Sequence, residues 1–453
     1  MKTIFISIPN AIAHRNYALF ERSVLDLLAC DKNIRTVVLS RRGVLPELLE
    51  KFRQRENVVV EEYDESQKKN FIQRAFIFFY SYLIFTPTTK LVSSYGVRSD
   101  RPRPLMRFWN YPIKLFIANV LGESEYIKES LVPRLYALIF NKRPYYYLFD
   151  KYNPDVVFLT NICTWPLDLE FLVEAKLKSV RTVGMVANWD HLSKYYVPFR
   201  PDKLLVWSNP IKDEALKYQG YKKENIKIVG APHTDFFLDK NNVVSRSEFL
   251  TKVNFPQDSK LITFCSQGPY SLDGPDLVQM ILNWIKAGDL PKNLRLIIRP
   301  HPHGLNEVKK YLPFKESSFV YIDTLEKLSS MPYALNFVNV LYHADIVLTT
   351  YSTIAADATI FDRPTVIASF DGYKNRPIFQ SVRRHRNFTH FQHILKFGAI
   401  SVAESPKQLL ESLKIYLASP EKDRENRLKL REEVFGYFDR QNSGRIYKEI
   451  LND

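Results

Sequence analysis

The sequence predicts an α/β protein in which two doubly wound parallel sheets face a central cleft. Short apolar runs alternate with longer amphipathic segments, which is the pattern of parallel strands covered by helices. This alternation stops in a polar stretch at residues 240–259 and then starts again. The chain has 453 residues, 45% of them apolar, which is enough to fill two cores.

The first half contains six apolar runs that predict strands. They lie at Thr3–Ile8, Thr36–Ser40, Val58–Val60, Val156–Thr160, Thr182–Ala187 and Lys203–Trp207, with helical patterns at Asn16–Ala29 and Leu167–Leu177. Residues 65–150 break the alternation and are rich in aromatic residues, lysine and arginine. We therefore expect a Rossmann-like domain over residues 1–240 with a helical insertion at about 65–150.

The second half repeats the strand–helix pattern. Strands are predicted at Leu261–Ser266, Leu294–Arg299, Phe319–Ile322, Ile346–Thr350 and Thr365–Ser369, and helices at Pro275–Lys286, Ala334–His343, Ile354–Phe361 and Pro406–Leu417. The expected second domain covers residues 241–453, and its last helix is a candidate to cross back to the first domain.

Composition excludes several classes of protein. Cys30, Cys163 and Cys265 lie far apart and form no CxxC pair, so neither a disulfide framework nor a zinc ribbon is predicted. The first residues are too short an apolar run for a signal peptide, and no uncharged apolar stretch reaches 18 residues. We expect a cytoplasmic protein.

The net charge of +15 suits an anionic membrane surface or a phosphate-bearing substrate. Basic residues are spread along the chain and no nucleic-acid-binding motif occurs, so nucleic acid is not an expected partner. The apolar segment Phe71–Phe85 has two interpretations: a buried or groove-lining helix, or an interfacial helix that dips into the inner face of a membrane.

Ligands of open α/β sheets bind at the carboxyl ends of the strands, so residues that follow strands are the candidates for a site. Arg299 and His301 follow directly after a predicted strand of the second half, in a turn that Pro300 and Pro302 stiffen. Both side chains can donate charge-assisted hydrogen bonds to phosphate. The alternative is a surface loop with a buried histidine.

Ser352 and Thr353 follow the predicted strand Ile346–Thr350, where a helix begins. Their hydroxyls and the free N–H groups of the helix predict a phosphate site, and Asp357, one turn later, could accept both hydroxyls of a ribose. Helix capping alone is the simpler alternative.

A small-residue turn, Ser266-Gln267-Gly268, follows the first strand of the second half and could bring backbone N–H groups close to a phosphate. The chain has no GxxxxGK[ST] and no GxGxxG motif, which disfavours P-loop and simple dinucleotide enzymes.

The first half offers an acceptor side. Asn188, Trp189, Asp190 and His191 follow a predicted strand and could bind acceptor hydroxyls or supply a base, although Trp189 could equally lie in the core. His14, next to Arg15 and Asn16 after the first strand, is the second candidate base, and a solvent-exposed or capping histidine is its alternative.

The histidine-rich stretch Arg383–His393 lacks the tight spacing of metal ligands. Phosphate or acceptor contacts and a plain basic loop are its two interpretations. We expect no metal site and no cofactor.

These residues, in this order, resemble glycosyltransferases of the GT-B fold. The closer resemblance, over residues 204–372, is to the CDP-glycerol glycerophosphotransferase family and related surface-polysaccharide transferases. It rests on His301-Pro302, Tyr351-Ser352-Thr353, Asp357, Arg363-Pro364 and Asp371. The resemblance implies that His301 and Ser352 or Thr353 bind the donor diphosphate and that Asp357 binds the ribose.

The family has an aspartate before the tyrosine, where this chain has Thr350. This departure weakens the case for a glycerol donor and favours a nucleotide-sugar. The leading hypothesis is therefore a metal-independent glycosyltransferase that uses a nucleotide-sugar donor and a glycan or lipid-linked glycan acceptor. In it His301 and Arg299 stabilise the leaving group, and His14 or Asp190 is the base. The alternatives are a glycerophosphotransferase, a nucleotide-sugar 2-epimerase and a non-catalytic glycan- or membrane-binding scaffold.

Overall fold

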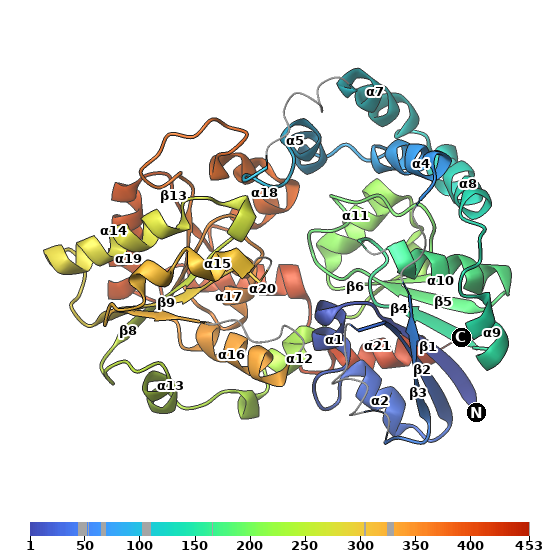
Figure 1. Ribbon diagram of the computed structural model, residues 1–453, viewed down its shortest axis with the longest axis horizontal. Helices are drawn as coiled ribbons and strands as arrows, with labels where there is room; N and C mark the ends of the chain where they lie inside the picture. Colours follow the sequence, from blue (N-terminus) through green and yellow to red (C-terminus); the bar gives the residue numbers. More distant parts are fainter. Residues whose placement is uncertain are drawn as a thin grey trace.

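The computed structural model describes residues 1–43, 52, 54–64, 69–101, 110–164, 166–302, 305–323 and 330–452. It has two lobes, and each contains a parallel sheet with helices against it (Figure 1). The predicted class, α/β with two doubly wound Rossmann-like sheets, is confirmed.

The first sheet has seven parallel strands in the order β3-β2-β1-β4-β5-β6-β7. They are β1 Lys2–Ile8, β2 Ile34–Arg41, β3 Val58–Tyr63, β4 Val156–Leu159, β5 Arg181–Met185, β6 Lys203–Val206 and β7 Ile226–Ile228. β1 lies at the centre, where the strand order reverses, and is buried along most of its length. The loops after β1 and β4 therefore diverge at this point and leave a crevice between them. Ligands of doubly wound sheets bind in such a crevice.

The second sheet has six parallel strands in the order β10-β9-β8-β11-β12-β13. They are β8 Lys260–Cys265, β9 Leu294–Arg299, β10 Val320–Ile322, β11 Ile346–Thr349, β12 Thr365–Ala368 and β13 Ser401–Ala403. Sequence patterns located every strand except β7 and β13. Both have only three residues and lie at a sheet edge, so neither carries a recognisable apolar run.

Helices cover both sheets. The first half has α1 Ala11–Tyr17, α2 Val24–Cys30, α9 Tyr146–Tyr152, α10 Pro166–Leu177, α11 Asn209–Gln219 and α12 His233–Phe237. The second half has α13 Arg246–Lys252, α14 Gly274–Ala287, α15 Leu305–Lys309, α16 Met331–Tyr342, α17 Ile354–Ile360, α18 Thr389–Leu395, α19 Pro406–Ala418 and α20 Arg424–Phe435.

The segment between β3 and β4 is helical where the structure describes it. It holds α4 Phe71–Ser81, α5 Pro87–Tyr95, α7 Tyr111–Phe116 and α8 Val132–Ile139, with π-helical turns at Ile117–Leu121 and Ile127–Leu131. α4, α7 and α8 form one end of the molecule, while α5 reaches across to α18 of the second half (Figure 1). Within the described ranges, no helix is both long and apolar enough to cross a bilayer.

The prediction of one helix over Asn16–Ala29 is wrong. α1 begins at Ala11, because the Asn10 side chain accepts a hydrogen bond from the N–H of Ala13 at 2.9 Å and caps the helix. The chain then turns, with Arg22 at a φ of 63°, and Ser23 caps the separate helix α2. This earlier start moves His14 and Arg15 from a loop into a helix.

The last helix, α21 Asn442–Leu451, lies against the first half, beside α2 and α12. Arg181 at the start of β5 donates to the carbonyls of Ile450 and Glu449 at 2.7 and 2.9 Å. The Asp235 carboxylate accepts from the backbone N–H groups of Asn442 and Ser443, which stabilises the start of α21. Besides the reach of α5 to the second half, the chain therefore passes between the two lobes near residue 240 and near residue 436.

Candidate active site

A cavity of about 550 Å³ lies between the two lobes. The first half contributes residues that follow β1, β4, β5 and β6, and the second half contributes residues that follow β8, β9 and β11. Since all strands are parallel, these loops lie at the carboxyl edges of both sheets, which is where the sequence placed the candidate residues.

Arg299, the last residue of β9, lines the cavity and is 4% exposed. Its guanidinium lies between the rings of Tyr333 and Phe337, at 4.7 and 4.8 Å from their centroids, and its Nη1 donates to Asp323. Burial alone would lower its pKa, but the Asp323 charge holds it above the ordinary value. Its Nη2 has no hydrogen-bond partner among the described residues. A ligand oxygen would satisfy this buried donor.

Arg15 brings a second cation to the cavity, from helix α1 of the opposite lobe. Its guanidinium lies 5.8 Å from the centroid of the Phe337 ring, the same ring that Arg299 contacts. Burial lowers the pKa of Arg15, and the neighbouring Arg299 lowers it further. Two like charges from opposite lobes thus converge on one space, an arrangement that a polyanion stabilises.

Ser352 and Thr353 line the cavity, and the alternative that their side chains only cap the following helix is wrong. In the part of the chain that the structure describes, Thr353 makes no side-chain capping hydrogen bond to α17. The Ser352 contacts to the helix start go through its backbone carbonyl. Both hydroxyls therefore stay available at the cavity wall for a ligand.

Asp357 lies on α17 and lines the same cavity. Burial raises the pKa of its carboxyl to about 7, although the positive charge of Arg15 opposes the shift. His233 Nε2 lies 4.0 Å from its Oδ1, and burial followed by the charge of Arg15 lowers the pKa of that imidazole to about 3. Asp357 can therefore accept hydrogen bonds from ligand hydroxyls beside a neutral histidine.

His301 lines the cavity after β9, and its ring meets the ring of Tyr270 edge-on at 5.7 Å. Gly268 lies directly behind it at a φ of +60°, and a Cβ there would come within 2.9 Å of the His301 Cβ. A side chain on residue 268 would thus displace His301. Gly268 supports the site by allowing this close approach.

The other two residues of the predicted turn differ in role. Ser266 lines the cavity, where its hydroxyl donates to Glu307 at 2.5 Å and accepts from the N–H of Gly268 at 3.1 Å. The Gln267 side chain accepts from Thr350 Oγ1 at 2.8 Å and donates to the carbonyl of Tyr351. It connects the ends of β8 and β11 and does not line this cavity.

On the first half, Asn188 and His191 line the cavity. Burial lowers the pKa of His191 to about 4 against the opposing charge of Asp190. Its Nδ1 is buried without a hydrogen-bond partner in the described structure. His191 is therefore a neutral imidazole at pH 7, the form that can accept a proton.

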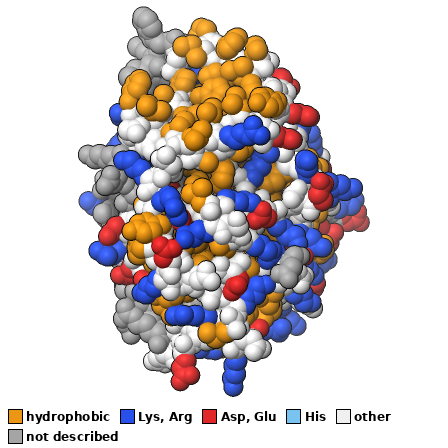
Figure 2. All heavy atoms as spheres, turned by 90° about the vertical axis from the view of Figure 1, so that its right-hand side faces the viewer, with side chains coloured by type: hydrophobic (Ala, Val, Ile, Leu, Met, Phe, Trp, Pro, Cys, Tyr) orange, Lys and Arg blue, Asp and Glu red, His pale blue; other side chains and the backbone are white. Residues whose placement is uncertain are grey.

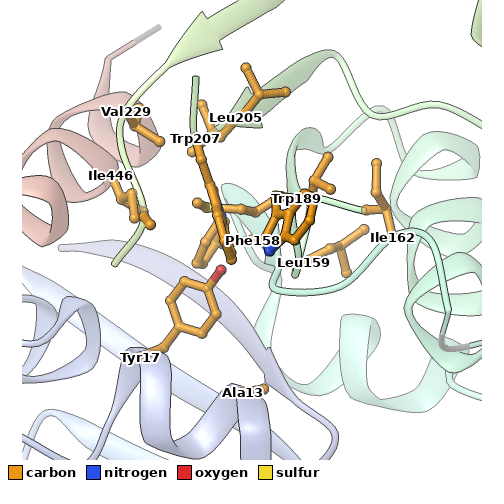
Figure 3. Close-up of a cluster of buried hydrophobic side chains, with 14 of the residues drawn as sticks. Ala13, Tyr17, Phe158, Leu159, Ile162, Trp189, Leu205, Trp207, Val229 and Ile446 are labelled. Carbon is orange, nitrogen blue, oxygen red and sulfur yellow. The ribbon is translucent and has the colours of Figure 1, made fainter. Parts of the chain in front are cut away.

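Asp190 and Trp189 do not line this cavity. Burial alone would raise the pKa of Asp190, but Lys194, which donates to its Oδ2, and the nearby imidazoles hold the pKa below its ordinary value. Trp189 is 6% exposed and lies among buried apolar side chains that include Phe158 and Ile162 (Figure 3), so the core alternative describes it.

His14 does not line the cavity either and is 4% exposed. The physical reason is the early start of α1: His14 lies in its second turn and is packed inside the lobe, while Arg15 beside it lines the cavity. The structure thus brings together Arg299, His301, Ser266, Ser352, Thr353, Asp357, Asn188 and His191, and leaves out His14, Trp189, Asp190, Gln267 and Gly268.

Sequence reasoning missed several polar groups of the cavity. Tyr17, Trp207 and His233 line it, and each has a buried polar atom without a partner among the described residues: Tyr17 Oη, Trp207 Nε1 and His233 Nδ1. Figure 3 shows that the Tyr17 hydroxyl points towards Trp207. Unpaired polar atoms concentrated in one cavity indicate a polar ligand. The sequence signal that could have located Arg15 and Tyr17 is Asn10. As a helix cap it sets the start of α1 at Ala11 and so determines which side chains of α1 line the cavity.

The histidine-rich stretch is not a plain solvated loop. Arg384 and His385 are each 1% exposed, and Arg384 donates to the carbonyl of Val97 at 2.8 Å. Thr389 at the start of α18 donates from its N–H to Thr88 Oγ1 at 2.8 Å. The stretch joins the second half to α5. Among the described residues, no group of three or more histidine, cysteine or acidic side chains could hold a metal ion.

Two parallel-sheet lobes with a charged cavity at their facing carboxyl edges define the GT-B class. A UDP-GlcNAc 2-epimerase from Neisseria meningitidis has a similar structure, with a TM-score of 0.55, 12% identity and full coverage of both chains. A glycosyltransferase from Rickettsia africae has a TM-score of 0.52 at 11% identity, covering 100% of this chain and 99% of its own. At such identities the likeness concerns the fold alone.

The family model described as CDP-glycerol:poly(glycerophosphate) glycerophosphotransferase matches residues 193–452, more than half of the chain. The chain belongs to this family of transferases. A teichoic acid poly(ribitol-phosphate) polymerase from Bacillus spizizenii is 23% identical over 175 residues. That match covers 37% of this chain and 26% of the relative, so this chain spans about a quarter of the relative's length.

The raised pKa of Asp357 makes the stability of the protein depend on pH. Its folded pKa of about 7 exceeds the ordinary 3.8, so folding opposes ionisation, and this costs stability as the pH rises from 4 to 7. Asp357→Asn removes the cost. We expect the free energy of unfolding of the variant, relative to the unchanged protein, to increase over this range by on the order of 4 kcal/mol. Urea unfolding at pH 4, 5.5 and 7.5 measures it, and a pH-independent difference would contradict the assignment.

Proposed function

We propose that this protein transfers a polyol phosphate from a CDP-linked donor to a hydroxyl of a growing surface polymer. The observation that carries the proposal is the convergence of Arg15 and Arg299, from opposite lobes, with the neutral His191 in one cavity. Family membership supports the donor class, since the family is described by CDP-glycerol. The family places the chain among transferases of surface-polymer synthesis that use a nucleotide-activated donor. That the donor is a CDP-polyol is our more specific proposal.

The donor would lie along the second half. Arg299, His301 and Arg15 would contact the diphosphate, together with the free hydroxyls of Ser352 and Thr353. Asp357 would accept the ribose hydroxyls. Each charge-assisted hydrogen bond that strengthens as charge builds on the leaving group lowers the barrier by about 3 kcal/mol. Arg299 suits this role because its guanidinium is already held between two rings and needs no reorganisation.

His191 would be the base. Its neutral imidazole would take the proton of the acceptor hydroxyl while the oxygen forms a bond to the phosphorus distal to cytidine. The bond from that phosphorus to the bridging oxygen breaks, and CMP leaves with the electron pair. This assignment replaces His14 and Asp190, because neither of them lines the cavity.

A nucleotide-sugar donor is the second candidate, and Thr350 favours it. Thr350 stands where the family has an aspartate before the tyrosine, and its hydroxyl donates a hydrogen bond to Gln267 Oε1 at 2.8 Å. A sugar transferase would form its bond at the anomeric carbon and release a nucleoside diphosphate. An epimerase would change the sugar without an acceptor. Product analysis after incubation with CDP-glycerol, CDP-ribitol or UDP-sugars separates the three: release of CMP supports the first proposal, and release of UDP or epimerised sugar contradicts it.

Replacing His191 tests the proposed base. His191→Ala should lower kcat by roughly 10²–10⁴-fold and leave donor affinity within about twofold, because the base acts on the acceptor proton. Stopped assays of CMP release and calorimetric titration of the donor measure the two quantities. The matched control is His393→Ala, a half-exposed histidine of α18 that is not among the residues lining the cavity. Activity of His191→Ala near that of the control would remove His191 from the mechanism.

We also propose that transfer needs no metal ion, since the cations of the chain itself can offset the charge of the diphosphate. Dialysis against EDTA should leave the rate of CMP release within about twofold of the untreated protein. Added Mg²⁺ or Mn²⁺ should not raise the rate further. A loss of more than tenfold that Mg²⁺ restores would show that the arginines do not suffice.

A third proposal concerns a membrane. Helices α4, α7 and α8 with the π-helical turn after α7 expose large apolar side chains: Phe71, Ile72, Ile113, Phe116, Val120 and Leu138, each between 54% and 77% exposed. We call this set the apolar cap. Figure 2 shows apolar side chains gathered at this end of the molecule. Exposed basic residues Arg74, Lys90, Arg134 and Lys142 lie on or near the same helices, and the net charge is +15. This combination suits an anionic bilayer surface.

The apolar cap predicts binding to anionic vesicles. The double variant Ile113→Ser/Phe116→Ser should reduce the fraction that floats with phosphatidylglycerol-containing vesicles at physiological salt by at least fivefold. Tyr373→Ser, which changes a 62% exposed aromatic residue of the second half, is the control. Equal flotation of both variants, or none by the unchanged protein, would contradict the proposal.

A further inference from the structure

We call the cavity of about 550 Å³ between the lobes the donor cavity. A second, smaller cavity of about 210 Å³ adjoins it. His301, Ser352 and Thr353 line both cavities, so the two spaces meet at the residues proposed to hold the donor diphosphate. The walls of the smaller cavity come from the loop after β5, the loops after β8, β9 and β11, the stretch around α18, and Val97 after α5. We call this space the side cavity.

The charges of the side cavity cancel. Its cation, Lys194, donates to its only described carboxylate, Asp190. Burial, and then the charge of Lys194, lowers the pKa of His390 to about 3, and burial lowers the pKa of His385 as well. The imidazoles of His390 and His385 are therefore neutral at pH 7. The donor cavity, with two arginines, attracts a diphosphate, whereas the side cavity offers no net charge to an anion.

The side cavity nevertheless holds buried polar atoms without partners. Asp190 Oδ1 and His390 Nδ1 have none within the described ranges, and both residues are 3% exposed. Aromatic side chains from both halves complete the walls, among them Tyr195, Tyr270 and Phe388. Neutral polar groups beside aromatic faces suit a polyhydroxylated ligand, whose hydroxyls satisfy the polar atoms and whose C–H groups pack on the rings.

We infer that the side cavity binds the terminal polyol or sugar unit of the acceptor, in uncharged form. The inference rests on the proposed transferase function and names the site for its second substrate. Asp190 Oδ1 lies 3.8 Å from His191 Nε2, so a ligand at Asp190 is next to the proposed base. On the other side, His301 and Ser352 line both this cavity and the one proposed to hold the donor. A terminal hydroxyl held here lies between base and donor.

Tyr195 allows a test with little risk to the fold, because it is 43% exposed and its backbone carbonyl, not its ring, accepts the hydrogen bond from Gln219. In Tyr195→Ala we expect the KM for a glycerol phosphate trimer to rise at least tenfold, while donor affinity stays within twofold. Tyr146→Ala, a 52% exposed tyrosine of α9, is the matched control and should change none of these.

A second probe tests the neutral character of the site. We compare the hydroxyl-ended trimer with a trimer whose last unit ends in a phosphate monoester. The dissociation constant of the phosphate-ended trimer, measured as an inhibition constant on the unchanged protein, should be at least tenfold higher than that of the hydroxyl-ended trimer. Tighter binding of the phosphate-ended trimer would overturn the inference, as would an unchanged acceptor KM in Tyr195→Ala or an equal loss of donor affinity. If the unchanged protein binds no nucleotide-activated donor, the proposed function itself fails. If the unchanged protein transfers normally and Tyr195→Ala behaves like the Tyr146→Ala control, the side-cavity assignment alone fails.

Discussion

The parallel direction of all thirteen described strands is the constraint on which the site depends. Parallel strands place all their carboxyl ends at one edge, and the two sheets turn those edges towards each other. Loops that lie up to 340 residues apart, such as those of Arg15 and Ser352, therefore line one cavity. Two chain passages, near residues 240 and 436, and the anchoring of α21 on the first half connect the lobes.

Burial then divides the polar residues of the cleft into those that keep charge and those that lose it. Arg299 keeps its charge because Asp323 and two aromatic rings surround it. His191, His233 and His390 lose theirs, since burial disfavours the imidazolium. The result is a cavity with two arginines next to one in which the charges of Lys194 and Asp190 offset each other.

The fold and about half of the site were predictable from local signals. Arg299, His301, Ser352 and Asp357 follow strands with strong apolar patterns, and the position after a parallel strand is enough to place them at the cleft. His14 does not line the cavity, because helix α1 starts at Ala11 and turns Arg15 towards it instead. Asp190 lines the adjoining smaller cavity, where Lys194 donates to it, and the position after a strand does not distinguish the two cavities.

The sequence by itself determined the two parallel sheets, the family resemblance and the group of cationic and hydroxyl side chains in the second half, because these follow from short-range periodicity and from residues adjacent to strands. Only the tertiary structure decided that Arg15 joins Arg299 on the Phe337 ring, that His191 and His233 are neutral in the cavity, and that the stretch around His390 forms the wall of a second space. Burial and charge pairing depend on contacts between residues distant in sequence, which no local pattern encodes.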